Sequence, residues 1–290
     1  MTKLTLIWIC WRGSESYGQT VNKLTALRWI GGKSVTSRTE TGRWLADRLP
    51  YRRGYVEPFA GMLGVLLQRD ASPVEVVNDI DGDIVNWWTQ IRDANDELVS
   101  MFERTPVWSE AMWKMSPEKL ANEDDPVWRA YWWTIRVAWS FGGNTRSIGR
   151  EFAGGRRQTR MEGKLSSLRD RIKDIQIANE DAVCLLERVA RRDDFVVYCD
   201  PPYDGTTTEY YSDNLDRERM TAGLLSQQGF CAVSGYANEW DHLGWNRYEI
   251  ETASVLAERA GKEAGKRTEV VWSNQPMRAE PQGQLFSSAL

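Results

Sequence analysis

Short apolar runs separated by helical patterns recur along the chain. Apolar residues indicate short strands at Tyr55–Glu57 and Val74–Asn78, with a turn and an apolar helix to about Gln68 between them. A further helix is predicted at Asp83–Arg92. Strand, helix and strand joined by short links are typical of the βαβ unit of a parallel sheet, so the pattern predicts an α/β fold.

Strand patterns return in the second half of the chain, after a long helical stretch. Residues 97–139 are helical in pattern and rich in tryptophan, and they lead into the Gly/Arg-rich segment Phe141–Arg160. Trp128, Trp132 and Trp139 recur at helical spacing, which predicts that they pack in a helical core. The later strands are predicted at Ile175–Ala178, Phe195–Cys199, Phe230–Ser234, Tyr248–Thr252 and Glu269–Trp272.

These elements predict a sheet domain with an insertion. Residues 24–96 and 175–275 would form the α/β sheet domain, and residues 97–174 a helical, basic insertion. Residues 1–23 resemble a flexible leader, and residues 276–290 a loose tail rich in polar residues.

The composition narrows the chemistry that the chain can perform. Its longest apolar run is far shorter than the roughly 20 residues of a membrane-spanning helix, so no membrane association is expected. The four cysteines form no C-x-x-C pair, which disfavours a disulfide framework or a cysteine-based zinc site and fits a reducing cytosol. A single histidine, His242, excludes multi-histidine metal sites and weakens any mechanism with a histidine base. We therefore expect no metal.

Basic residues are concentrated in one segment of this acidic chain. The formal net charge is −4, yet residues 142–173 hold nine basic side chains and three acidic ones. Such segregation allows an acidic protein to present a face to phosphates, although a solvated basic loop and helix explains the charge equally well. The residues expected to contact phosphates are Arg146, Arg150, Arg156, Arg157, Arg160 and Lys164.

The most informative motif is Asp200-Pro201-Pro202-Tyr203, directly after the apolar run FVVYC. Ligand sites in open α/β sheets lie beyond the carboxyl ends of the strands. Successive prolines fix the backbone and remove its donors, so an aspartate oxygen and the Pro201 carbonyl become two acceptors that can hold an exocyclic NH₂ group. Holding both hydrogens bends the nitrogen toward tetrahedral geometry and frees its lone pair. Tyr203 offers a ring on which an extruded base can stack.

Three weaker motifs accompany it. Glu57-Pro58-Phe59-Ala60-Gly61 ends the first strand with a glycine that allows close approach of a ligand. Asn78-Asp79-Ile80-Asp81 ends the second strand with acids that suit ribose hydroxyls, although Asp81 could equally cap the following helix. Arg28-Trp29-Ile30-Gly31-Gly32-Lys33 is a Gly-Gly turn between an aromatic residue and a cation, without Walker spacing.

In this order and at these strand ends, the four motifs resemble the Dam-type DNA adenine N6-methyltransferases, including their bacteriophage members. The resemblance spans roughly residues 24–275 and includes the late RTEVVWSN strand. It implies a Rossmann-like methyltransferase sheet that uses S-adenosylmethionine, with a helical target-recognition insertion and double-stranded DNA as substrate. One departure concerns the F-x-G-x-G pattern of many members: here the second glycine, Gly64, stands one place later.

The resemblance also implies roles for individual residues. Trp29 and Lys33 would line the cofactor pocket, and Asp79 would take the ribose hydroxyls. Asp200 would serve both the cofactor pocket and the target amine, so that Asp200, Pro201, Pro202 and Tyr203 are the catalytic candidates. Glu57, Phe59 and Gly61 would lie beside the methionine part of the cofactor.

Other functions remain open at this point. Cytosine also presents an exocyclic amine, so N4 methylation is an alternative, although a serine is commoner than Asp200 at that motif position in such enzymes. Methylation of adenine in RNA is a second alternative. A catalytically silent DNA-binding relative is a third, and the presence of Lys33, Asp79 and the whole DPPY motif argues against it.

Overall fold

The computed structural model describes most of the chain between residues 24 and 279. The predicted leader lies outside the described residues, as does most of the predicted tail. The described ranges are 24–29, 32–33, 41–106, 108–149, 161–203, 215–252 and 267–279.

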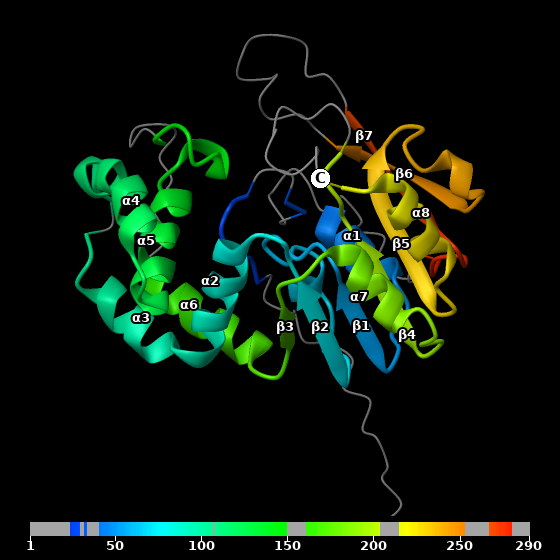
Figure 1. Ribbon diagram of the computed structural model, residues 1–290, viewed down its shortest axis with the longest axis horizontal. Helices are drawn as coiled ribbons and strands as arrows, with labels where there is room; N and C mark the ends of the chain where they lie inside the picture. The colour runs from blue at the N-terminus through cyan, green and yellow to red at the C-terminus, as the bar shows by residue number, and fades with distance from the viewer. Residues whose placement is uncertain are drawn as a thin grey trace, which may run out of the picture.

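A single mixed sheet forms the centre of the molecule (Figure 1). Its order is β3-β2-β1-β4-β5-β7-β6; β1 to β5 pair in parallel, and β7 runs antiparallel between β5 and β6. The seven strands are β1 (Gly54–Glu57), β2 (Val74–Asn78), β3 (Gln176–Ala178), β4 (Phe195–Cys199), β5 (Phe230–Tyr236), β6 (Asn246–Thr252) and β7 (Arg267–Ser273). This arrangement is consistent with the Rossmann-like methyltransferase fold.

Eight helices are described around the sheet, and several start at an aspartate whose side chain caps the first turn. Asp81, Asp125 and Asp216 each accept hydrogen bonds from backbone N–H groups that the helix itself leaves unpaired. The helices are α1 (Thr41–Arg48), α2 (Gly82–Asp93), α3 (Asn95–Glu103), α4 (Glu110–Asn122), α5 (Pro126–Ala138), α6 (Met161–Ile172), α7 (Ala182–Val189) and α8 (Arg217–Leu225). None of the described helices is long and apolar enough to cross a bilayer.

Alternating side chains of the parallel strands enter two hydrophobic clusters, one on each face of the sheet. In β4, Val196 and Tyr198 join the cluster that includes residues of α1, α2, α5 and α6. Val197 and Cys199 join the cluster formed with α7 and α8. Burial on both faces explains why these strands are continuous apolar runs in the sequence.

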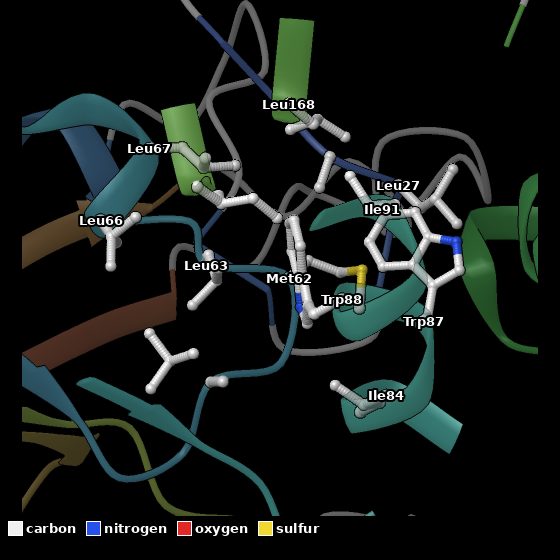
Figure 2. Close-up of a cluster of buried hydrophobic side chains, with 14 of the residues drawn as sticks. Leu27, Met62, Leu63, Leu66, Leu67, Ile84, Trp87, Trp88, Ile91 and Leu168 are labelled. Atoms are coloured by element: carbon white, nitrogen blue, oxygen red, sulfur yellow. The ribbon is translucent and has the colours of Figure 1, made fainter. Parts of the chain in front are cut away.

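The helical region packs on the sheet domain through one shared core. Figure 2 shows Trp87 and Trp88 of α2 beside Met62 from the segment after β1 and Leu168 of α6. Figure 1 places α3, α4 and α5 together at one end of the sheet, beyond α2.

Two sequence predictions in these regions are wrong. The apolar helix expected to reach Gln68 is only a 3₁₀ turn, η1 (Leu66–Gln68), because the chain turns at Gly61 and Leu63, whose φ angles are +44° and +52°. Trp132 and Trp139 are buried as predicted, but Trp128 is 44% exposed because it lies on the side of α5 that also carries the partly exposed Arg129 and Arg136.

Candidate active site

The predicted catalytic motif lies where the order of the parallel strands reverses. β1 and β4 are neighbours in the sheet, while the chain proceeds from β1 toward β3 on one side and from β4 toward β5 on the other. Asp200 directly follows β4, and Pro58 directly follows β1. Open α/β sheets bind ligands in the crevice at such a point, so the fold places the motif at the preferred position for a site.

Lys33 joins the catalytic motif to the glycine turn that sequence analysis placed in the cofactor pocket. Its Nζ donates to Asp200 Oδ1 over 2.6 Å and to the Tyr203 hydroxyl oxygen over 2.7 Å. The Tyr203 hydroxyl also lies 2.9 Å from Asp200 Oδ1. These three residues, predicted from separate motifs, form one buried cluster.

Glu269 of β7 is a fourth member of this cluster that sequence analysis did not single out. Its Oε1 lies 2.9 Å from Lys33 Nζ and accepts a hydrogen bond from the Tyr203 hydroxyl over 2.9 Å. The residue stands in the RTEVVWSN strand, which contributed to the family resemblance only as a whole. An acidic residue next to two buried valines at the centre of a strand was the available signal.

The pKa values of Lys33 and Asp200 depend on their burial and on the presence of two carboxylates beside one ammonium. Burial alone would lower the pKa of Lys33, but ion pairing with Asp200 and Glu269 outweighs burial and raises it well above its usual value. Burial raises the pKa of Asp200; Lys33 opposes that effect, and the charge of Glu269 adds to it. One ammonium is therefore shared by two carboxylates.

The two oxygens of Asp200 are in different environments. Oδ1 accepts from Lys33 and lies 2.9 Å from the Tyr203 hydroxyl, whose single proton it shares with Glu269, whereas Oδ2 accepts no hydrogen bond from any residue that the structure describes. The Asp200 side chain is 20% exposed. One oxygen thus fixes the carboxylate, and the other remains accessible for a donor from outside the protein.

Polar contacts with the end of β2 shape the loop after β1. Gly61 N donates to Asp79 Oδ2 over 2.9 Å, and Asn78 Nδ2 donates to the Pro58 carbonyl over 2.9 Å. A side chain at Gly61 would meet only Trp29 Cδ1, at 3.9 Å, so the space beside this glycine is otherwise open among the described residues. The backbone at Gly61 therefore borders an open space next to the Asp79 carboxyl, which we call the Gly61 cradle.

Of the two acidic residues at the end of β2, Asp81 is the helix cap and Asp79 is not. Asp81 caps α2, accepting from Asp83 N over 2.8 Å. Asp79 Oδ1 accepts from Asp81 N over 3.0 Å. Burial raises the pKa of Asp79 to about 6, against the opposing effect of its backbone hydrogen bonds. Each Asp79 oxygen has a second lone pair with which it can accept a hydroxyl.

Glu57 is buried beneath the same loop. Its Oε1 accepts from the Tyr55 hydroxyl over 2.6 Å and from Leu66 N over 2.8 Å. Burial raises its pKa to about 7, although these two hydrogen bonds oppose the shift. The carboxyl therefore supports the loop from below and is protonated in mildly acidic solution.

This shift predicts that stability falls as the pH rises through mildly acidic values. Below about pH 4.5 both folded and unfolded forms hold the Glu57 proton, whereas between pH 4.5 and about 7 only the folded form holds it. The free energy of unfolding should decrease by up to about 3 kcal/mol across this window. Glu57→Gln should flatten that part of the pH dependence in denaturant titrations, and Glu249→Gln on exposed β6 should leave it unchanged. An unaltered slope in Glu57→Gln would contradict the assignment.

Of the remaining predicted cofactor residues, Trp29 lies beside Gly61, whereas Phe59 faces another part of the core. Trp29 packs against Trp133 of α5, with ring centroids 5.5 Å apart. Phe59 packs against the opposite hydrophobic cluster. The displaced second glycine, Gly64, has a structural reason: a Cβ there would lie 2.7 Å from the carbonyl carbon of Lys33. Gly64 therefore gives the Lys33 backbone room to enter the site.

The turn formed by Asp200, Pro201, Pro202 and Tyr203, which we call the proline corner, is held in place by contacts from α8. Arg217 Nη2 donates to the Pro202 carbonyl over 3.3 Å, and Nη1 pairs with Glu239 Oε1 over 2.9 Å. Glu239 Oε2 in turn accepts from Tyr236 N at the end of β5. The ring of Tyr203 packs edge-on against that of Tyr236, with centroids 4.8 Å apart. The corner is thus fixed by both neighbouring elements.

The structure describes only part of the predicted DNA-binding set. Arg146 is exposed, in the segment after the 3₁₀ turn η2 (Phe141–Gly143). Lys164 is half-buried and donates to the Ala26 carbonyl over 2.8 Å, which ties α6 to the segment before Trp29. The other predicted residues lie outside the described ranges; they are Arg150, Arg156, Arg157 and Arg160.

Comparison with known families agrees with this geometry. Residues 137–232 match the model of the D12 class N6 adenine-specific DNA methyltransferases. No curated protein matches the chain. The matched third of the chain includes β4 and the whole DPPY corner and supports adenine-specific DNA methyltransferase activity. Over these residues the chain is similar to the D12 class of N6 adenine-specific DNA methyltransferases, which is consistent with the Dam-type resemblance of its strand-end motifs.

Proposed function

We propose that this protein transfers a methyl group from S-adenosylmethionine to the N6 amine of adenine at specific sites in double-stranded DNA. The catalytic residues would be Asp200, Pro201, Pro202 and Tyr203. The observation that carries the proposal is the asymmetry of Asp200, whose Oδ1 is anchored by Lys33 and Tyr203 while Oδ2 is open. This acceptor lies at the strand-order switch, where the fold favours a ligand.

The chain's own residues would act by positioning the amine. Asp200 Oδ2 accepts one amine hydrogen and the Pro201 carbonyl accepts the other, which directs the nitrogen lone pair away from the corner. Tyr203 would provide a face for the extruded base, and its packing against Tyr236 fixes the plane of its ring. Direct displacement by a positioned amine requires neither a covalent enzyme intermediate nor a histidine base.

The residues around the Gly61 cradle fit the proposed donor. The carboxylates of Asp79 and Asp200 suit a ligand with ribose hydroxyls and positive charge, and the open space at Gly61 allows close approach. S-adenosylmethionine, when bound, supplies an electrophilic methyl group on a cationic sulfur. Trp29, Lys33, Glu57 and Phe59 would complete the surroundings of this ligand.

Titration of S-adenosylmethionine onto the purified protein tests the proposal against a silent DNA-binding relative. Saturable binding that is lost in Asp79→Ala but kept in Asp83→Ala, in the first turn of α2, is the expected result. An absence of binding to the parental protein would favour the silent relative. Sequencing of modified bases in DNA from expressing cells would then give the modified base and the recognition site together.

The helical region of residues 97–174 would form the target-recognition part, with the sheet elements on either side as the catalytic part. Its support is the basic segment of the sequence and the position of α3 to α5 at one end of the sheet (Figure 1). Phosphate contacts by basic residues give affinity that falls with salt.

Replacing Arg156 and Arg157 together by glutamine tests this interface. If both contact phosphates, the slope of log affinity against log salt should decrease in magnitude by about 2, since each contact contributes roughly 0.9. Fluorescence anisotropy with a labelled duplex measures the slope. The matched control replaces Arg188 and Arg191, on and just beyond α7, and should keep the parental slope. An unchanged slope in the first variant would move the DNA interface elsewhere.

A further inference from the structure

The charges around Asp200 are unequal in a way that the proposed reaction does not by itself require. Among the described groups of the cluster, the carboxylates of Asp200 and Glu269 share the single ammonium of Lys33. A simple Lys33–Asp200 ion pair would hold the catalytic carboxylate equally well. The presence of the second carboxylate, that of Glu269, therefore requires an explanation.

Glu269 shares Lys33 with Asp200, so the ammonium neutralises the charge of Asp200 less completely. Glu269 makes no described contact with Asp200 Oδ2. All its described contacts run through Oε1, to Lys33 Nζ and to the Tyr203 hydroxyl, and it reaches Asp200 only through these two groups. Its side chain is 13% exposed and that of Lys33 is 5% exposed, so water screens these charges little. Their effect on Asp200 is correspondingly strong.

Two consequences follow for a ligand at the corner. A carboxylate that shares its ammonium is a stronger hydrogen-bond acceptor for an amine. Lys33, Asp200 and Glu269 together carry two negative charges and one positive charge, and the Arg217–Glu239 pair beside Pro202 adds no net charge. Such a corner attracts a cationic ligand more than a neutral ligand of the same shape. Both effects favour a reaction in which positive charge passes from a sulfonium to an amine.

We propose that Glu269 is a positioning residue of the methyl-transfer site, which shares Lys33 and Tyr203 with Asp200 and so keeps the corner negative toward a cationic donor and an attacking amine. This inference rests on the proposed function. It assigns a role in the site to a strand residue that none of the four motifs contains.

The test is Glu269→Gln in the full-length protein, since glutamine retains the size and the acceptor oxygen but removes the charge. The probes are S-adenosylmethionine and its neutral thioether product S-adenosylhomocysteine. Calorimetry should show that the variant loses about tenfold in affinity for the sulfonium relative to the thioether. Its kcat should fall roughly 10- to 100-fold, while its affinity for duplex DNA stays unchanged.

Two further variants separate charge from packing. Glu269→Asp keeps the charge and should retain the parental preference for the sulfonium even if its kcat falls. Glu249→Gln, on the neighbouring strand β6 and exposed, should leave both measurements unchanged. Equal loss of affinity for the two probes in Glu269→Gln, or no loss at all, would overturn the inference. Failure of the parental protein to bind either probe would instead count against the proposed function.

Discussion

Replacing Asp200 by alanine is expected to reduce adenine methylation by roughly 10³-fold or more while the protein stays folded. The amine would lose its only carboxylate acceptor at the corner. The fold should survive, because Lys33 keeps Glu269 at 2.9 Å and is not left as an unpaired buried charge. Transfer of labelled methyl groups into duplex DNA measures the rate, and thermal unfolding measures the fold.

Asp194 provides the matched control for this variant. It stands at the opposite end of the same strand, directly before Phe195, where it pairs with Arg192 near the surface. Asp194→Ala should retain parental activity, because catalytic groups in this fold gather at the carboxyl ends of the strands. If Asp200→Ala methylates DNA at near the parental rate, the proposed mechanism is wrong.

Gly143→Ala is expected to disturb the cofactor site from the side of the helical region. Gly143 has a φ angle of +76°, and a Cβ there would lie 2.1 Å from the Arg28 carbonyl oxygen and 3.1 Å from Trp29 Cα. The segment that carries Trp29 toward Lys33 would have to move. We expect affinity for S-adenosylmethionine to fall by about tenfold or more, since small displacements of positioning groups have large effects.

Gly142→Ala separates this contact from backbone strain. Gly142 also has a positive φ angle, +63°, but a Cβ there meets nothing within 4 Å. Both variants should lose about 1–2 kcal/mol of stability from the left-handed backbone, and only Gly143→Ala should lose additional stability and cofactor affinity. Calorimetric titration measures the affinity of the two variants for S-adenosylmethionine, and thermal unfolding measures their stability. Equal behaviour of the two would show that the close contact with Arg28 is unimportant.

Local sequence was sufficient for the strands and for the main catalytic motif. The predicted bounds of β2 (Val74–Asn78) and β4 (Phe195–Cys199) agree with the structure, because buried parallel strands are short, uninterrupted apolar runs. The position of the DPPY motif in the fold could be predicted for a related reason, because the end of a strand in an α/β sheet already specifies a position in space.

Features that depend on distant contacts could not be predicted in this way. The turn at Gly61 is fixed by Asp79 and by Trp88 Nε1, which donates to the Gly61 carbonyl, so the apolar residues after it do not continue as a helix. Glu269 lies 236 residues from Lys33, and in sequence a single acid within a strand resembles a solvent-facing position. The contact of the Lys164 amine with the Ala26 carbonyl, 138 residues away, likewise has no local signal in the sequence.

The central claim is that the Asp200–Pro201 corner makes the N6 amine of adenine nucleophilic. Incubation of unmodified duplex DNA with the protein and methyl-labelled S-adenosylmethionine, followed by digestion to nucleosides and mass spectrometry, tests it most directly. The label should appear in N6-methyldeoxyadenosine and should be absent with Asp200→Ala. Label in N4-methyldeoxycytidine, or equal labelling by the two proteins, would contradict the claim.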